Sequence, residues 1–153
     1  MSPITIYIDA DACPVKDEVY KVAGRYGLKT FVVANAFLQI PASPLIERVI
    51  VESGPDIADD WIAERVEAGD VVITNDIPLA ERVLAAGGSA IAPNGRAFNN
   101  NSIGSAIAQR AIMEQIRSTG EITGGPRPFT AADRSQFLQA MDQAIQQELR
   151  RRR

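Results

Sequence analysis

The sequence predicts an α/β fold, namely a three-layer α/β/α sandwich with a mainly parallel central sheet and C-terminal helices packed on it. The first observation is that short β-rich runs alternate with helical patterns, as in βαβ units. The second is the run from Asp70 to Thr74, whose Val-Val-Ile centre is typical of a parallel strand buried on both faces. We expect one domain over residues 1–153, with a helical extension from about residue 93.

The first third of the chain is expected to hold one helix between strands. Strands are predicted over residues 4–8, 30–34 and 48–51. Pro14 suits the first turn of a helix, apolar residues then recur at helical spacing as far as Tyr26, and Gly27 closes the segment. The connection over residues 37–44 is punctuated by prolines and has no predicted form.

The middle of the chain repeats the alternation. Gly54 and Pro55 break the chain, and a helix is expected to begin at Asp56. A strand over 70–74 is followed by a helix over 78–86 and a short strand over 89–92.

The last third is helical in pattern. Residues 93–101 are polar and rich in turn-forming types, a helix is expected over 102–117, and residues 118–129 form a loop rich in Gly, Pro and Thr. Thr130 is expected to cap the final helix with Asp133 in an approximate capping box. The inner side of that helix is expected to carry Phe137, Leu138, Met141, Ile145 and Leu149.

Composition excludes several classes of function. The chain has no histidine, which removes Ser-His and Cys-His catalysis and histidine-rich zinc sites. A net charge of −3 is not that of a protein that coats nucleic acid electrostatically, although a local basic rim can still hold a phosphate backbone. One cysteine excludes an internal disulfide framework. Without an apolar span or a signal-peptide pattern, we expect a cytoplasmic protein with no membrane partner.

Aspartates gather where strands are predicted to finish and helices to begin. They are Asp9 and Asp11, then Asp56, Asp59 and Asp60, and then Asp76. In an open α/β sheet these positions meet at the edge formed by the carboxyl ends of the strands. Carboxylates held together repel one another unless a cation lies between them, and hard oxygen ligands favour Mg²⁺ or Mn²⁺. The pattern therefore predicts a site for such an ion and points to phosphate chemistry.

Structural roles for the same aspartates remain open. Asp11 is a candidate cap for the first helix, and Asp9 a solvated loop acid. Asp56 and Asp76 each have the setting of an N-cap, and Asp59 that of a first-turn acid favoured by the helix dipole. Three carboxylates at one helix end, however, exceed what capping requires.

These acidic segments resemble the PIN-like nuclease domains. The resemblance rests on Asp9 after the first strand, on the string Asp59-Asp60-Trp61-Ile62-Ala63, and on the string Val72-Ile73-Thr74-Asn75-Asp76. It implies that Asp9, Asp11, Asp59 and Asp76 bind one or two Mg²⁺ or Mn²⁺ ions and act in catalysis, with Asp56 and Asp60 as neighbours. PIN nucleases usually carry a glutamate on a helix between the first and second acids. Glu18 and Glu47 match it only by residue type.

The chain resembles the bacterial YaiI/YqxD family more closely, and almost end to end. The matching strings are Asp9-Ala10-Asp11-Ala12-Cys13-Pro14-Val15-Lys16, Gly54-Pro55-Asp56-Ile57-Ala58-Asp59-Asp60-Trp61, Thr74-Asn75-Asp76-Ile77-Pro78-Leu79-Ala80, Thr123-Gly124-Gly125-Pro126 and Asp133-Arg134.

Several residues are candidates for holding the phosphate or substrate. They are Lys16, Thr74, Asn75, Arg110 and Arg134, with Arg117 as a further part of a basic rim. Each of the cations is equally a solvated surface residue. Cys13 has the setting of a lowered thiol pKa at a helix start, but without a histidine we expect it to pack.

Three functions compete. The first is a metal-dependent nuclease that hydrolyses RNA or another phosphodiester. The second is a phosphatase of the haloacid dehalogenase type, which also begins with a strand and Asp-x-Asp, although Cys13 stands where that pattern has Thr or Val. The third is a non-catalytic module that binds a metal, a nucleotide or RNA. A protein partner is not predicted by any motif.

Overall fold

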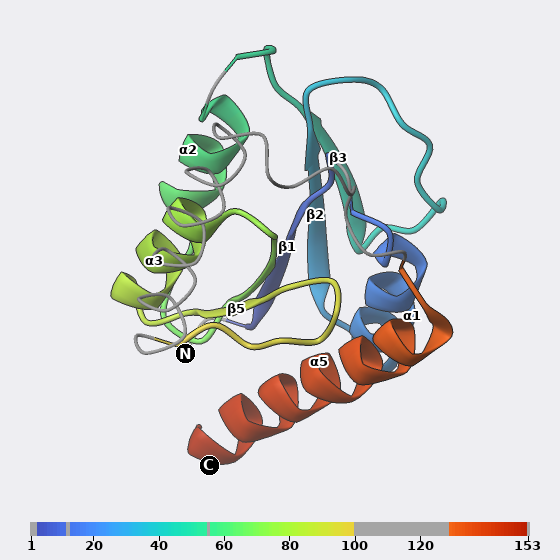
Figure 1. The fold of residues 1–153 in the computed structure, drawn as a ribbon, viewed down its shortest axis with the longest axis vertical. Helices are drawn as coiled ribbons and strands as arrows, with labels where there is room; N and C mark the ends of the chain where they lie inside the picture. Colours follow the sequence, from blue (N-terminus) through green and yellow to red (C-terminus); the bar gives the residue numbers. More distant parts are fainter. Residues whose placement is uncertain (1–2, 12, 55, 100–128, 153) are drawn as a thin grey trace, which may run out of the picture.

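The computed structural model of the chain describes residues 3–11, 13–54, 56–99 and 129–152 (Figure 1). The described strands are β1 (Thr5–Asp9), β2 (Lys29–Ala34), β3 (Ile46–Ile50), β4 (Val71–Ile73) and β5 (Ser89–Ile91). The described helices are α1 (Lys16–Tyr26), α2 (Ile57–Ala63), α3 (Ile77–Ala85) and α5 (Ala131–Arg151).

The sheet is parallel throughout, in the order β3-β2-β1-β4-β5. From β1 the chain first builds outward to β2 and β3, and it then returns to the other side of β1 to build β4 and β5. The direction of winding therefore reverses between β1 and β4. In open α/β sheets, this topological switch point is where ligands bind.

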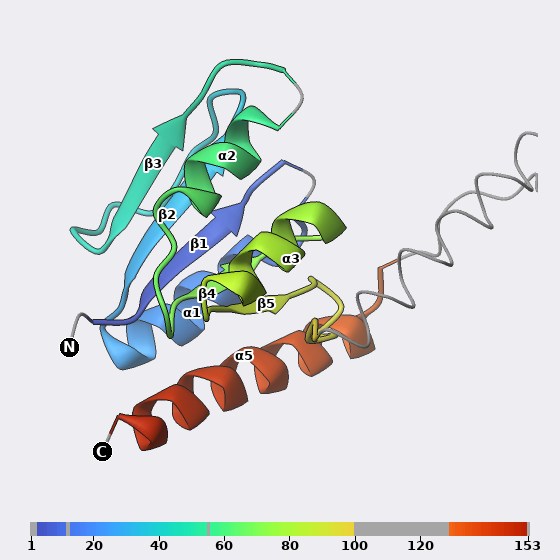
Figure 2. The same ribbon diagram turned by 90° about the vertical axis from the view of Figure 1, so that its left-hand side faces the viewer.

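Helices cover both faces of the sheet, which confirms the predicted three-layer sandwich (Figures 1 and 2). On one face, α1 and α5 contribute Val19 and Phe137 to a core that includes Ile6. On the other face, α2 and α3 contribute Ile62 and Leu79 to a second core. All of β4 is buried, as its apolar run predicts.

The final helix is fixed at its start and along its length. The Thr130 hydroxyl accepts from the Asp133 N–H at 3.1 Å, and the Asp133 carboxylate accepts from the Thr130 N–H at 2.9 Å, so the predicted capping box is confirmed. Further along α5, the Asp142 carboxylate accepts a hydrogen bond of 2.6 Å from the Tyr26 hydroxyl at the end of α1. Phe137 is fully buried between these two anchors.

The predicted elements lie close to the observed ones. The largest shift at a strand start is in β3, which begins at Ile46 rather than at Arg48. Gly27 ends α1 as predicted, with a φ of 67° that favours glycine. The helix expected over 102–117 and the loop over 118–128 lie outside the described residues. None of the helices in the described ranges is long and apolar enough to cross a membrane.

The turn after β5 packs tightly against α5. Gly95 has a φ of 90°, and a Cβ atom at this position would lie 2.6 Å from the carbonyl carbon of Gln136 in the helix. This contact joins the last strand to the final helix. By contrast, a Cβ atom at Gly24 in α1 would meet no atom within 4 Å.

We predict that Gly95→Ala and Gly24→Ala change stability in opposite directions. Gly95→Ala should lower the free energy of unfolding by at least about 1–2 kcal/mol, because an L-residue is strained at positive φ even before the clash with Gln136. Gly24→Ala should raise it by about 0.5–1 kcal/mol, since alanine is the better helix former. Urea unfolding with an unchanged m-value measures both. A Gly95→Ala protein as stable as the natural one would contradict the packing of this turn on α5.

Candidate functional site

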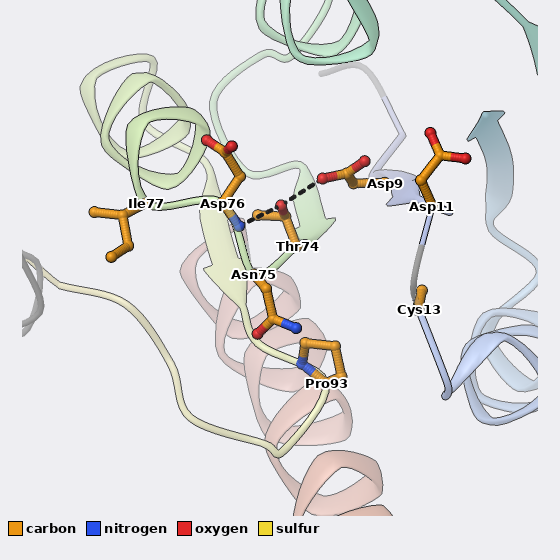
Figure 3. Close-up of a pocket in the computed structure, with 8 residues that line it drawn as sticks. All are labelled: Asp9, Asp11, Cys13, Thr74, Asn75, Asp76, Ile77 and Pro93. Atoms are coloured by element: carbon orange, nitrogen blue, oxygen red, sulfur yellow. Dashed lines mark hydrogen bonds between the residues drawn. The ribbon is translucent and has the colours of Figure 1, made fainter. Parts of the chain in front are cut away.

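A cavity of about 400 Å³ opens at the carboxyl edge of the sheet, at the switch point between β1 and β4 (Figure 3). Its walls come from the segments that follow β1, β4 and β5. The lining residues are Asp9, Asp11, Cys13, Thr74, Asn75, Asp76, Ile77 and Pro93. Three of the aspartates singled out by the sequence therefore share one cavity.

Thr74 joins two of these acidic residues. Its hydroxyl donates to the Asp9 carboxylate at 2.8 Å and accepts from the backbone N–H of Asp76 at 2.9 Å (Figure 3). The Asp76 carboxylate also accepts from the Leu79 N–H at 2.8 Å, which confirms that Asp76 caps α3. Capping uses one carboxylate oxygen, so Asp76 lines the cavity and starts the helix at the same time.

Asp11 lies on the other side of β1. Its two carboxylate oxygens are 3.2 and 3.4 Å from the backbone nitrogen of Asn35, which donates to them at the end of β2. The N-cap position of α1 is Val15, which makes no side-chain capping bond. The alternative that Asp11 caps the first helix is therefore wrong. Asp9 and Asp11 line one cavity but are anchored to opposite neighbours of β1.

Asp59 approaches the cavity from the first turn of α2. The pKa of its carboxyl group is raised to about 7, first by burial and then by the charges of Asp76 and Asp9, a hydrogen bond with Asp76 and the charge of Asp56. These causes place Asp59 within electrostatic reach of both acids. The three acidic segments of the sequence are thus brought together, although Asp59 is not one of the lining residues.

Asp9 is the most enclosed of the acids at this edge. Burial raises the pKa of its carboxyl group, the hydrogen bond from Thr74 lowers it, and the charges of Asp76 and Asp11 raise it again. The ionised form of Asp9 is therefore less favourable here than in water, and a positive charge in the cavity would stabilise it.

The donors at the site are of the kind that hard divalent cations prefer. Asp9, Asp11, Asp76 and Thr74 offer only oxygen atoms, and the mutual repulsion of the carboxylates favours a cation between them. Within the described ranges, however, no three acidic, cysteine or histidine side chains are already grouped as a metal-binding set. The residues fit Mg²⁺ or Mn²⁺ by donor type and by charge, and a bound ion would have to draw the carboxylates closer together.

Asp56 and Asp60 are directed elsewhere. Asp56 is exposed at the N-cap position of α2, with a φ of 67° and no side-chain capping bond. The Asp60 carboxylate pairs with Arg82 of α3 at 2.6 Å. Neither residue lines the cavity, and a role for either as a metal ligand stays a prediction.

The predicted basic residues lie beside the cavity rather than in it. Lys16 donates from Nζ to the Cys13 carbonyl oxygen at 2.7 Å. Arg134 donates to the Pro14 carbonyl oxygen at 2.8 Å and pairs with Glu18 at 3.1 Å. Both cations therefore hold the loop between β1 and α1.

Of the other predicted phosphate-binding residues, Thr74 and Asn75 line the cavity. Arg110 and Arg117 lie outside the described residues.

Neither candidate glutamate takes the place expected from the PIN-like resemblance. Glu18 pairs with Arg134, and its Oε2 atom is buried with no hydrogen-bond partner among the described residues. Glu47 pairs with Lys29 at 3.4 Å on the edge strand β3. Neither side chain lines the cavity.

Sequence reasoning missed two contributors to the site. Asn35 holds Asp11 through its backbone N–H, a contact that no side-chain motif signals. Pro93 lines the cavity two residues after β5, and the rule that ligands bind at strand ends pointed to this position. The prediction that Cys13 packs is confirmed, since it is 6% exposed and burial raises the pKa of its thiol.

Comparisons with known proteins find relatives that match nearly the whole length of the chain. A family model described as "Uncharacterized BCR, YaiI/YqxD family" matches residues 7–147. A UPF0178 protein of Caulobacter vibrioides is 64% identical over 141 residues, which cover 92% of each chain. A UPF0178 protein of Rhodopseudomonas palustris strain BisB5 is 58% identical over 151 residues, which cover 99% of this chain and 92% of the relative.

No solved structure matches the chain. The family model spans the cavity residues from Asp9 to Pro93 and continues into α5. With that match and these relatives, the chain belongs to the YaiI/YqxD family.

Proposed function

We propose that this protein is a hydrolase that cleaves RNA phosphodiesters with the help of Mg²⁺ or Mn²⁺ at the acidic cavity. The observation that carries the proposal is the convergence of Asp9, Asp59 and Asp76 from three segments at the switch point, where their charges raise the pKa values of Asp9 and Asp59. Acidic side chains that disfavour one another's ionised form are typical of functional sites.

The carboxylates of Asp9, Asp59 and Asp76 would hold the ion, with Asp11 at the opposite wall. A divalent cation supplies charge stabilisation at a phosphate and a nucleophilic water at neutral pH. Thr74 orients Asp9 through its hydroxyl and positions Asp76 through the Asp76 N–H. Asn75 and Lys16 are placed to contact a phosphate at the rim, Asn75 because it lines the cavity and Lys16 because it is bonded to Cys13 there.

Asp59 gives the site a proton to exchange near neutral pH. With a pKa of about 7, its carboxyl group is partly protonated under these conditions and can accept a proton at a carboxylate oxygen. Asp59 would have to lose that proton before its carboxylate could hold a cation.

We predict that Mn²⁺ binds and stabilises the natural protein, and that Asp9→Asn and Asp59→Asn weaken this effect strongly. At a concentration one hundred times the Kd, a ligand adds about 2.7 kcal/mol of stability, which raises Tm on the order of 5–10 °C for a domain of this size. Calorimetric titration and thermal unfolding measure both effects. Affinity should increase from pH 6 to pH 8, because Asp59 loses its proton in that range.

Asp60→Asn is the matched control. It removes the same charge one residue further along α2, from a carboxylate that pairs with Arg82 instead of facing the cavity. Mn²⁺ affinity should remain close to the natural value in this variant. An equal loss in Asp59→Asn and Asp60→Asn would show that only overall charge matters and would contradict a defined site.

We further predict that Asp59→Asn makes the metal-free protein more stable at pH 8. The folded-state pKa of Asp59 is about 7, above its ordinary value of 3.8, so the folded state binds this proton more tightly than the unfolded state. Its contribution to stability is therefore present at low pH and is lost as pH rises from about 4 to 7. Thermal melts in EDTA at pH 5 and pH 8 should show a gain in Tm at pH 8 that shrinks at pH 5.

Cleavage of single-stranded RNA with Mn²⁺ tests the activity itself. Asp9→Asn should lower the rate at least a hundred-fold, and Thr74→Val about 10- to 100-fold, since residues that orient a metal ligand typically contribute that much. Thr74→Val keeps the shape of the side chain and removes the hydroxyl that holds Asp9. Cleavage that survives Asp9→Asn would refute the mechanism and point to a contaminating nuclease.

A second candidate is a non-catalytic module that binds a metal, a nucleotide or RNA, and it is favoured because neither Glu18 nor Glu47 lines the cavity. A stoichiometric partner recovered by pull-down, together with no hydrolysis of any phosphate substrate, would support it.

A phosphatase of the haloacid dehalogenase type would trap phosphate on Asp9. Labelling of Asp9 in a phosphoenzyme experiment would favour that reaction. None of the described residues that line the cavity is a lysine, so a phosphoryl group bonded to Asp9 would lack a close positive charge.

A further inference from the structure

An exposed aromatic side chain lies beside β3 with a cation over its ring. Phe37 is 66% exposed and Ile50 is 49% exposed, and these are the exposed large hydrophobic residues of the described chain. The Arg48 guanidinium lies 4.2 Å from the centroid of the Phe37 ring. Arg48 and Ile50 are on the same face of β3 because they are two residues apart in a strand. Phe37, Arg48 and Ile50 thus form one patch.

The positive charge of Arg48 is not neutralised. Arg48 Nη1 donates to the Leu38 carbonyl oxygen at 3.2 Å, which fixes the guanidinium, but it forms no salt bridge with a residue of the described chain. Three other cations of the described chain also lie over aromatic rings, and all three are paired with glutamates. Lys29 pairs with Glu47, Arg65 with Glu64 and Arg134 with Glu18.

The patch lies at the same edge of the sheet as the acidic cavity. Phe37 is two residues beyond Asn35, so their Cα atoms are at most about 7 Å apart. Asn35 itself donates to Asp11, which lines the cavity. Ile50 is the last residue of β3 and pairs with Ala34 at the end of β2. A chain molecule bound in the cavity can therefore continue over the patch.

Building on the proposed function, we propose that Phe37 and Arg48 form a base-stacking subsite for single-stranded RNA next to the cavity. An exposed ring face accepts a nucleobase of any type, since every base has a π-face. The fixed guanidinium, which forms no salt bridge within the described chain, adds an attraction for phosphate beyond that of Lys16 at the rim of the cavity. A partner held by apolar contact alone would gain nothing from that charge, which is why a polyanion with flat bases fits the patch.

The test is the binding of a fluorescently labelled single-stranded RNA of about eight nucleotides, measured by anisotropy in EDTA so that no cleavage occurs. Phe37→Leu keeps the apolar character and removes the ring, and it should weaken binding roughly ten-fold. Arg48→Gln should weaken binding and reduce its salt dependence. Arg65→Gln is the matched control, because Arg65 also lies over a ring, that of Trp61, on the face covered by α2.

The outcomes separate this subsite from the nuclease proposal. Weaker RNA binding by Phe37→Leu and Arg48→Gln, with Arg65→Gln unchanged, supports the subsite even if the natural protein cleaves nothing. Unchanged RNA binding by Phe37→Leu overturns the subsite even if cleavage depends on Asp9. No RNA binding by the natural protein overturns it as well. A third result would also overturn it. If Phe37→Leu changes the oligomeric state and leaves RNA binding intact, the patch is a contact between protein chains.

Discussion

The parallel pairing of β1 with β4 is the constraint on which the site depends. Ile8 lies beside Ile73 in the ladder, so Asp9 at the end of β1 and Thr74 just after β4 lie side by side. The turn into α3 then brings Asp76 to the same point, and α2 brings Asp59. The carboxylates therefore lie close together because of the path of the backbone and despite their mutual repulsion. The hydroxyl of Thr74, bonded to Asp9 and to the Asp76 N–H, is the neutral contact that holds this arrangement together.

One side chain at this edge both supports the fold and lines the cavity. Asp76 begins α3 and also lines the cavity, so removing its capping oxygen would disturb the helix together with the site. Asp59 is not the cap of a helix, and burial and its acidic neighbours make its ionised form less favourable. Natural proteins commonly carry such destabilising groups where function requires them. Asp76 thus stabilises the fold by capping α3, whereas an ionised Asp59 lowers the stability of the folded state.

Much of the fold could be predicted from the sequence, because the period of the apolar residues in a helix or strand and the residues that break the chain are local properties. The buried run of β4, the end of α1 at Gly27 and the capping box at Thr130 are all set by nearby residues. The site followed only in part. Asp59 and Asp60 are adjacent in sequence, but they have different surroundings because Asp60 pairs with Arg82 on another helix. Asp11 depends on Asn35 at the end of a neighbouring strand. No local pattern reveals such partners, and none marked Phe37 as an exposed ring beside Arg48.

The contact of Arg134 with the Pro14 carbonyl joins positions 120 residues apart. During synthesis the N-terminal strands emerge first and begin to fold, whereas α5 is made after all five strands. The loop that carries Asp11 and Cys13 can gain this support only after α5 has been made. A nascent or C-terminally shortened protein would therefore have its central strands but a loosely held acidic loop. The acidic edge of the sheet therefore takes its final shape only after α5 has packed against the loop that follows β1.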